Sequence, residues 1–248
     1  MKNYSYIGIS LVILVFGIIV IPEIIDRIEG EAVVKSNRSD TKEEREASKK
    51  ELAYVIMNGE KKRIPDFSFV NQDGDTITQE DYKGKVFVAE FFFTTCPTIC
   101  PIMNKNLVGV QEKFKNNEDF GIASFSIDPT HDTPQVLKQY AEVHGIDHQN
   151  WHLLTGDREE IYDLANSGFN IYAGEDPEAE GGFAHSGYFA LIDQEGFIRS
   201  REDKFGNPII YYRGSVERGK QVGVGEEEPQ IDILEQDIIN LLKNGAKD

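Results

Sequence analysis

The feature that most constrains the fold is the run from Val86 to Phe93, which contains a single charged side chain, Glu90. A run this apolar and this rich in β-branched and aromatic residues is typical of a strand buried on both faces. Such a strand needs a layer of helices on each side. Both cysteines of the chain, Cys96 and Cys100, follow within seven residues. The run therefore predicts a layered sheet with its thiols just past the end of a buried strand.

Apolar periodicity places the other elements. Spacings of three and four residues predict helices over 103–114, 136–143, 161–168 and 231–241. Short apolar runs predict strands over 122–127, 151–154, 188–192 and 209–212. Asn58-Gly59 and Asp73-Gly74 indicate two hairpins near the start of this region. After the hairpins the order is β-α-β-α-β-α-β-β-α, which predicts an α/β fold: a sheet with parallel units first, an antiparallel pair near the end, and helices on both faces.

The N-terminal 22 residues are predicted to be a transmembrane anchor. Residues 4–22 carry no charge and would span about 28 Å as a helix, close to the apolar thickness of a bilayer. Lys2 precedes them and Glu23 follows, so the positive-inside tendency places the rest of the chain outside the cytoplasm. A cleaved signal peptide is the alternative, but Ile21-Pro22 makes a poor cleavage site.

Residues 23–51 hold nine acids and seven bases and are predicted to be a charged membrane-proximal linker. The globular domain is predicted to cover residues 52–248. Most of the formal net charge of −17 belongs to that domain, and this charge argues against nucleic acid as a partner. Two cysteines are too few for a disulfide-framework scaffold or a four-cysteine zinc site.

Cys96 and Cys100 are the strongest chemical feature. A helix N-terminus favours thiolates, and an i,i+4 spacing on a helical turn would put both sulfurs on one face. The pair could share a metal or form a redox-active disulfide. A purely stabilising disulfide is disfavoured, because so short a loop gains little from closure. Two thiolates suit Cu(I), and a nitrogen ligand would let the site hold Cu(II) or zinc as well.

Five histidines could supply that nitrogen. His144, His148 and His152 lie in a polar stretch and are predicted to be surface residues, and His131 is predicted to be a solvated turn residue. His185 lies in a glycine-flanked loop just before the strand at 188–192. Its position alone leaves a metal ligand and an ordinary loop histidine equally open.

Several motifs occur in one order and carry a family resemblance. They are Pro65-Asp66-Phe67, Gly84-Lys85-Val86, Phe92-Phe93-Thr94-Thr95-Cys96-Pro97-Thr98-Ile99-Cys100-Pro101, Ser126-Ile127-Asp128-Pro129 with Asp132-Thr133-Pro134, Trp151 with Leu154-Thr155-Gly156, His185-Ser186 and Leu191-Ile192-Asp193. Over about residues 65–200 and the closing helix, the chain resembles the Sco/SenC family of membrane-anchored, thioredoxin-like copper proteins.

The resemblance implies a function and a site. It implies a thioredoxin-like fold, copper bound as Cu(I) or Cu(II) by Cys96, Cys100 and His185, and Asp128 as a residue that shapes the site. It also implies a metallochaperone, not an enzyme and without catalytic residues, that delivers copper to the copper-bearing subunit of a cytochrome c oxidase. The globular domain would then lie on the extracytoplasmic, periplasmic side.

Three features depart from the family pattern. Thr95 stands where a histidine often precedes the first cysteine, and Ala184 stands where an aspartate often precedes the ligand histidine. Neither position is expected to bind metal directly. Residues 199–228 are longer than in a minimal member and are predicted to be a surface elaboration.

The alternative function is an extracytoplasmic thiol–disulfide oxidoreductase that keeps partner cysteines reduced. The sequence favours metal handling, because the spacing is CxxxC rather than CxxC and no proline occurs between Pro177 and Pro208. No Lys or Arg lies between Lys85 and Lys105 to activate a peroxidatic thiolate. The two functions are compatible, since copper binding requires an extracytoplasmic reductant to keep the thiols free.

Four acids occupy residues 175–180, shortly before His185. A solvated loop is the simpler interpretation of such a run. The alternative is a docking patch for a basic partner, or a field that draws cations to the site.

Overall fold

The computed structural model describes residues 52–202, 208–221 and 227–244. The predicted anchor, residues 1–22, and the predicted linker, residues 23–51, lie outside them. Among the described residues, no helix has the length and apolarity needed to cross a membrane.

The described residues form a domain in which a mixed sheet has helices on both faces. Its elements are β1 (Ala53–Tyr54), β2 (Ile56–Met57), β3 (Glu60–Lys61), β4 (Ser68–Val70), β5 (Thr76–Thr78), η1 (Gln79–Tyr82), β6 (Val86–Phe92), α3 (Cys100–Phe114), β7 (Phe120–Ser126), α4 (Pro134–His144), β8 (Trp151–Leu154), α5 (Arg158–Asp163), η2 (Leu164–Phe169), β9 (Ala173–Glu175), β10 (Phe183–His185), β11 (Tyr188–Ile192), β12 (Ile198–Glu202), β13 (Pro208–Ile209), β14 (Tyr212–Arg213) and α6 (Ile231–Asn244).

The main sheet has the order β1-β12-β11-β6-β7-β8. Strands β6, β7 and β8 are parallel, with Glu90 opposite Ser124, and β11 and β12 are antiparallel additions on the other side of β6. The predicted parallel units are therefore confirmed, whereas the antiparallel partner of β11 in the main sheet is β12 and not the strand predicted at 209–212. The hairpins predicted at Asn58-Gly59 and Asp73-Gly74 are also present, as β2–β3 and β4–β5.

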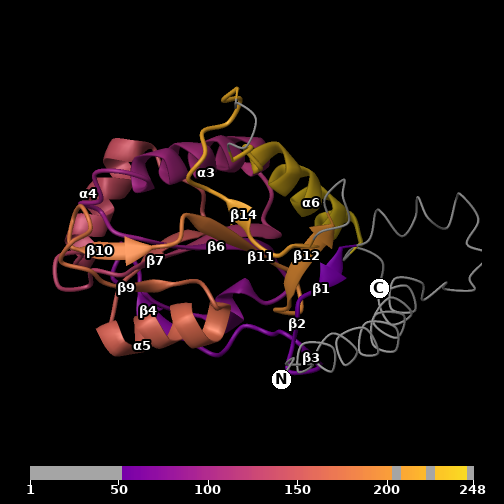
Figure 1. Cartoon of the computed structure of the whole chain (residues 1–248), viewed down its shortest axis with the longest axis horizontal. Helices are drawn as coiled ribbons and strands as arrows, with labels where there is room; N and C mark the ends of the chain where they lie inside the picture. The colour runs from indigo at the N-terminus through magenta and orange to yellow at the C-terminus, as the bar shows by residue number, and fades with distance from the viewer. Residues whose placement is uncertain (1–51, 203–207, 222–226, 245–248) are drawn as a thin grey trace, which may run out of the picture. The chain divides into compact units, whose positions relative to one another are not determined.

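Helices α3, α4 and α6 cover one face of the sheet, and α5 with the β4–β5 hairpin covers the other (Figure 1). Alternate residues of a strand point to opposite faces. Phe91 and Phe125 pack against Phe169 and Phe67 on the α5 side, whereas Phe92 meets Tyr140 of α4. Because β6 is fully buried between these two layers, its carboxyl end is held in a fixed position.

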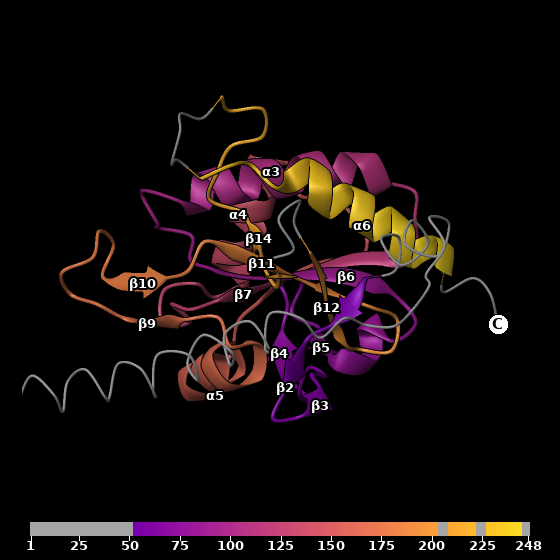
Figure 2. The ribbon, with the colours of Figure 1, turned by 45° about the vertical axis from the view of Figure 1, so that its right-hand side comes forward.

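Several predictions about later elements were wrong. The strand predicted at 209–212 is two short strands, and these pair with different partners: β13 with β12, and β14 with β11. The β9–β10 hairpin and β12 were not predicted, because their residues are polar or glycine-rich and lack an apolar run. Figure 2 shows β9 and β10 extending past the end of the sheet.

The segment predicted as a surface elaboration is partly built into the domain. Tyr212 is fully buried and donates a hydrogen bond to Asp237 of α6 at 2.8 Å. The side chain of Asn106 in α3 donates to the carbonyls of Gly214 and Val216, both at 2.9 Å. This segment therefore ties β11, α3 and α6 together.

Candidate metal centre

Cys96 and Cys100 flank the turn that joins β6 to α3. Helix α3 begins at Cys100, so Cys96 lies in the turn before it and not on a helical turn as predicted. The amide of Cys96 donates to the carbonyl of Phe93 at 3.3 Å, which closes the turn. Met103, Leu107 and Val110 are fully buried along α3 and hold the helix against the sheet. Both cysteines are buried, free thiols.

His185 completes a cluster with the two thiols. Its Nε2 atom lies 3.2 Å from the Sγ atom of Cys100, and the ligand atoms of Cys96, Cys100 and His185 all lie within 4.8 Å of one another. Bonds of about 2.0–2.3 Å to one ion would bring three such atoms to within about 4 Å of each other. The three atoms therefore need only small movements to share one ion.

The electrostatics of the pair favour one thiolate. A hydrogen bond from Cys100 lowers the pKa of Cys96 to about 3, with a smaller contribution from His185, although burial opposes it. The shared proton and burial raise the pKa of Cys100 far above its usual range. The pair therefore holds one proton between two sulfurs at neutral pH, which makes Cys96 the nucleophilic atom.

His185 is the last residue of β10, paired with Ala173 of β9, rather than a residue of an irregular loop. Its ring packs edge-on against Phe93 at 5.8 Å between centroids, and Phe93 also contacts Phe183. Its Nδ1 atom is buried without a hydrogen-bond partner among the described residues. Packing against Phe93 therefore orients the imidazole, and its Nε2 faces the thiols.

The β9–β10 hairpin also forms one wall of a pocket of about 360 Å³ beside Cys96. Cys96 and His185 line it together with Phe183 and Glu180. Glu180 belongs to the acidic run at residues 175–180, and its side chain is exposed. One acid of the run, Glu180, therefore lies beside the candidate metal centre, whereas Glu175 pairs with Arg158.

Asp132 fastens the cysteine turn and was not predicted to do so. Its fully buried carboxylate accepts hydrogen bonds from the Thr94 amide at 3.0 Å, the Ser126 hydroxyl at 2.5 Å and the Thr94 hydroxyl. His131 Nδ1 lies 2.9 Å from the same carboxylate, which raises the pKa of that exposed histidine. The signal available in the sequence was an acid near the start of a helix, which is typical of a cap.

Asp128 lies in the same turn, but its main chain makes the contacts. Its amide donates to Ser126 Oγ at 3.2 Å, and its carbonyl accepts from the amides of His131 and Asp132. In the described part of the chain its carboxylate makes no hydrogen bond. The role of Asp128 in shaping the site stays a prediction. Asp132, and not Asp128, is the acid whose carboxylate binds the cysteine turn, through Thr94. Thr95 is exposed and Ala184 half-buried, and neither belongs to the cluster.

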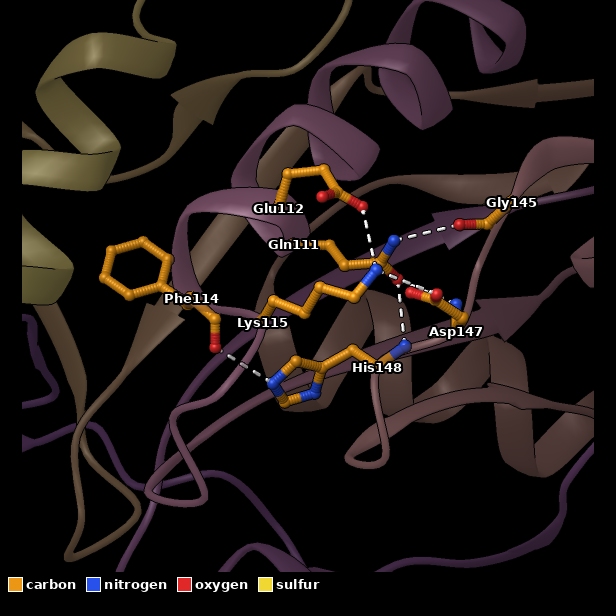
Figure 3. Close-up of polar contacts among 7 residues, drawn as sticks. All are labelled: Gln111, Glu112, Phe114, Lys115, Gly145, Asp147 and His148. Carbon is orange, nitrogen blue, oxygen red and sulfur yellow. Dashed lines mark hydrogen bonds and ion pairs between the residues drawn. The ribbon is translucent and has the colours of Figure 1, made fainter.

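The other four histidines do not belong to the cluster. His131 and His144 are exposed, as predicted. The prediction that His148 is a surface residue was wrong. Its Nε2 faces the Phe114 carbonyl at 3.3 Å, and burial lowers its pKa. Figure 3 shows how the Gln111 side chain holds the adjoining turn, with its oxygen accepting from the Asp147 and His148 amides and its nitrogen donating to Gly145.

The prediction for His152 was also wrong, because this side chain is half-buried beside Tyr82 rather than on the surface. Its Nδ1 lies 3.4 Å from the Asn71 side chain, and burial lowers its pKa. His148 and His152 therefore belong to the packing around β8, and only His185 reaches the thiols.

Comparisons with known proteins agree with this geometry. The model of the SCO1/SenC family matches residues 56–214. The SCO1 protein homolog of Bacillus subtilis is 38% identical over 137 residues, which cover 54% of this chain and 70% of that protein.

Two solved structures extend the comparison. The structure of BsSco, described as a member of the Sco family of cytochrome c oxidase assembly proteins, matches with a TM-score of 0.57 at 31% identity, over 73% of this chain and 93% of that chain. The copper-bound structure of Bradyrhizobium japonicum ScoI matches with a TM-score of 0.50 at 26% identity, over 57% of this chain and 89% of that chain.

The fold and the site define a thioredoxin-like protein in which a histidine faces two free thiols. The extent of the family match allows a narrower statement. The chain belongs to the SCO1/SenC family. The predicted family resemblance and the predicted fold of the globular domain are thereby confirmed.

Proposed function

We propose that the protein is a copper metallochaperone whose cargo is held by Cys96, Cys100 and His185. The observation that carries this proposal is the convergence of two thiols and one imidazole nitrogen within 4.8 Å at the carboxyl end of β6. Thiolates select soft ions such as Cu(I), and an imidazole suits both oxidation states of copper. The copper-bound relative of the same family supports copper as the cargo.

The receiving partner is the copper-bearing subunit of a cytochrome c oxidase. The description of the Sco family as oxidase assembly proteins supports this assignment. The pocket beside Cys96 has the β9–β10 hairpin as one wall, which supports direct access of a partner to the ion. Residues 1–22 anchor the protein in a membrane, residues 23–51 connect the anchor to the domain, and the domain acts on the extracytoplasmic side.

A thiol–disulfide oxidoreductase is the second candidate, favoured by the low pKa of Cys96. A nucleophilic thiolate beside a second thiol can reduce a partner disulfide and form a Cys96–Cys100 disulfide in return. Such an activity would prepare the cysteines of the receiving subunit for copper.

Metal analysis separates the two candidates. The reduced protein should bind one copper ion per chain, and the disulfide form should bind none, because oxidation removes both thiolate ligands. Cys96→Ser, Cys100→Ser and His185→Ala each remove one proposed ligand. His148→Ala is the control for His185→Ala, because it removes a histidine outside the cluster. Copper retained by a chemically verified disulfide form contradicts the proposed site. Metal-free protein that reduces partner disulfides yet binds no copper favours the oxidoreductase.

A further inference from the structure

Main-chain hydrogen bonds at the two ends of the β9–β10 hairpin fix its register. The amide of Asp176 donates to the carbonyl of Gly182, and the amide of Ser186 donates to the carbonyl of Tyr172, both at 3.0 Å. In an antiparallel pair of strands, residue pairs that are hydrogen-bonded to each other alternate with pairs that are not. The residue pairs next to these two bonds, one at each end of the hairpin, are therefore not hydrogen-bonded to each other.

These two pairs are Phe183 with Glu175 and His185 with Ala173. The N–H and C=O groups of Phe183 and His185 therefore point away from β9. Strands β9 and β10 form a sheet of their own, and among the described residues no hydrogen bond reaches the main chain of Phe183 or His185. Strand β10 thus presents an open edge.

The outer edge of β9 is closed. The side chain of Asn166 accepts a hydrogen bond from the Ala173 amide at 3.2 Å and donates one to the Ala173 carbonyl at 2.8 Å, as a neighbouring strand would. The Glu175 side chain on the same strand pairs with Arg158. Unpaired strand edges invite pairing with another chain, so proteins commonly cover them. In this hairpin one edge is covered, and the edge that carries His185 is not.

The open edge borders the candidate metal centre. The three residues Phe183–His185 line the pocket beside Cys96, together with Thr98 and Ile99 of the cysteine turn. Successive side chains of a strand point to opposite faces, so a pocket that touches three residues in a row lies along the edge of that strand. A strand added to β10 would therefore lie between β10 and the cysteine turn.

We propose that the open edge of β10 binds an extended segment of the copper-receiving partner as a third strand. The main chain of this segment would pair with the N–H and C=O groups of Phe183 and His185, which is one of the general modes of peptide recognition. The identity of the partner as a copper receiver rests on the proposed function, whereas the open edge does not.

The added strand would bring a partner side chain to the thiols. Phe183 and His185 share one face of β10, because both rings pack against Phe93, and His185 Nε2 lies 3.2 Å from the sulfur of Cys100. Residues directly opposite each other in an antiparallel pair point to the same face. The partner residue opposite His185 would therefore face the thiols, where a cysteine, methionine or histidine could take the ion.

The charge of the hairpin fits a basic segment. Glu178 and Glu180 are exposed just before β10, and Glu180 also lines the pocket. Within the part of the chain that the structure describes, neither acid forms an ion pair. Lysine or arginine at the end of the added strand would complement these two charges and speed its association.

Amide hydrogen exchange, followed by NMR on the full-length, reduced and metal-free protein, tests the open edge without copper. The probe is a short capped peptide of valine and threonine with one central methionine and a lysine at each end. In the free protein the amides of Phe183 and His185 should exchange faster than that of Ala184, which the register pairs with Gly174 of β9. With the peptide at about a hundred times its dissociation constant, exchange at Phe183 and His185 should slow by up to about a hundredfold.

Two matched pairs of reagents isolate the main-chain contacts. Peptides that are N-methylated on alternate residues lose the N–H groups of one side only, so one peptide should lose binding and its counterpart should keep it. Phe183→Pro removes the ring and the outward N–H, whereas Phe183→Ala removes the ring alone. A proline is tolerated in an edge strand where its N–H would face outward, so Phe183→Pro should fold and should weaken peptide binding more than Phe183→Ala does.

Three results would overturn the proposal: no binding of the peptide, binding without slower exchange at Phe183 and His185, or equal affinities of the two methylated peptides. Copper stoichiometry, measured separately, distinguishes this from a failure of the proposed function. A protein that binds the peptide along β10 but binds no copper keeps the docking edge and refutes only the cargo.

Discussion

Asp132→Asn should destabilise the protein by removing acceptors from beneath the cysteine turn. Four donors from three residues meet the two oxygens of this carboxylate: the Thr94 amide and hydroxyl, the Ser126 hydroxyl and the His131 ring. An asparagine in either orientation presents its NH₂ group to two of them. Each hydrogen bond to a charged group contributes about 1.5–3 kcal/mol, and a hydroxyl can turn to accept instead. The expected loss is therefore about 2–4 kcal/mol, a large share of the ~5–15 kcal/mol typical of a folded protein.

Urea unfolding at fixed pH measures this loss as a lower midpoint with an unchanged slope. Asp128→Asn is the matched control, because it makes the same chemical change four residues earlier, where the carboxylate makes no hydrogen bond among the described residues. The control should stay within about 0.5 kcal/mol of the wild type. Equal stabilities of Asp132→Asn and the control would refute the argument that Asp132 fastens the turn. Since Thr94 lies two residues before Cys96, copper binding should also weaken in Asp132→Asn.

Three further predictions concern the site itself. His185→Ala should largely spare Cu(I) binding while weakening Cu(II) binding, because imidazole matters more to the harder ion; unchanged binding of both ions, measured by competition with chelators, would show that His185 is not a ligand. In the reduced protein Cys96 should be alkylated by iodoacetamide at nearly the same rate from pH 5 to pH 8, since its pKa is lowered to about 3; a rate that rises tenfold per pH unit over this range would contradict this thiolate assignment. Neutralising Glu175, Asp176, Glu178 and Glu180 should slow copper transfer to a partner at low salt and change little at high salt, with stoichiometry unaltered; equal low-salt rates would leave the run as a solvated loop.

Elements with a strong local signal were predictable from the sequence. Strands β8 and β11 begin and end at the predicted residues, and the predicted apolar stripe of α3 is buried throughout. Their residues are buried apolar residues whose spacing follows the period of the element, so the local pattern and the tertiary contacts agree.

Features that depend on distant partners were not predictable. Strand β12 contains Arg199, whose buried charge is matched by Asp193 at 2.8 Å. His148 is buried, with its ring facing the Phe114 carbonyl and its amide donating to Gln111, both far away in sequence. Asp132 accepts a hydrogen bond from the amide of Thr94, which lies in a different loop, and no spacing within the sequence reveals that contact. In each case a polar residue is satisfied by a group that only the folded chain brings near.

Within the candidate site, the sequence alone predicted the thiol pair and left His185 undecided. The place of His185 in the sequence could not show that β10 pairs with β9. Nor could it show that Phe93 orients the imidazole toward Cys100. The motif resemblance identified His185 as the third ligand. The structure adds the distances between its imidazole nitrogen and the two sulfurs, on which a shared ion depends.

X-ray absorption at the copper edge, measured on the copper-loaded, reduced protein, tests the central claim most directly. Two sulfur scatterers and one imidazole nitrogen around a single copper ion are expected in the wild type, with the imidazole contribution lost in His185→Ala and retained in His148→Ala. A copper ion surrounded only by nitrogen and oxygen, or an unchanged imidazole contribution in His185→Ala, would contradict the assignment of Cys96, Cys100 and His185 as the copper ligands.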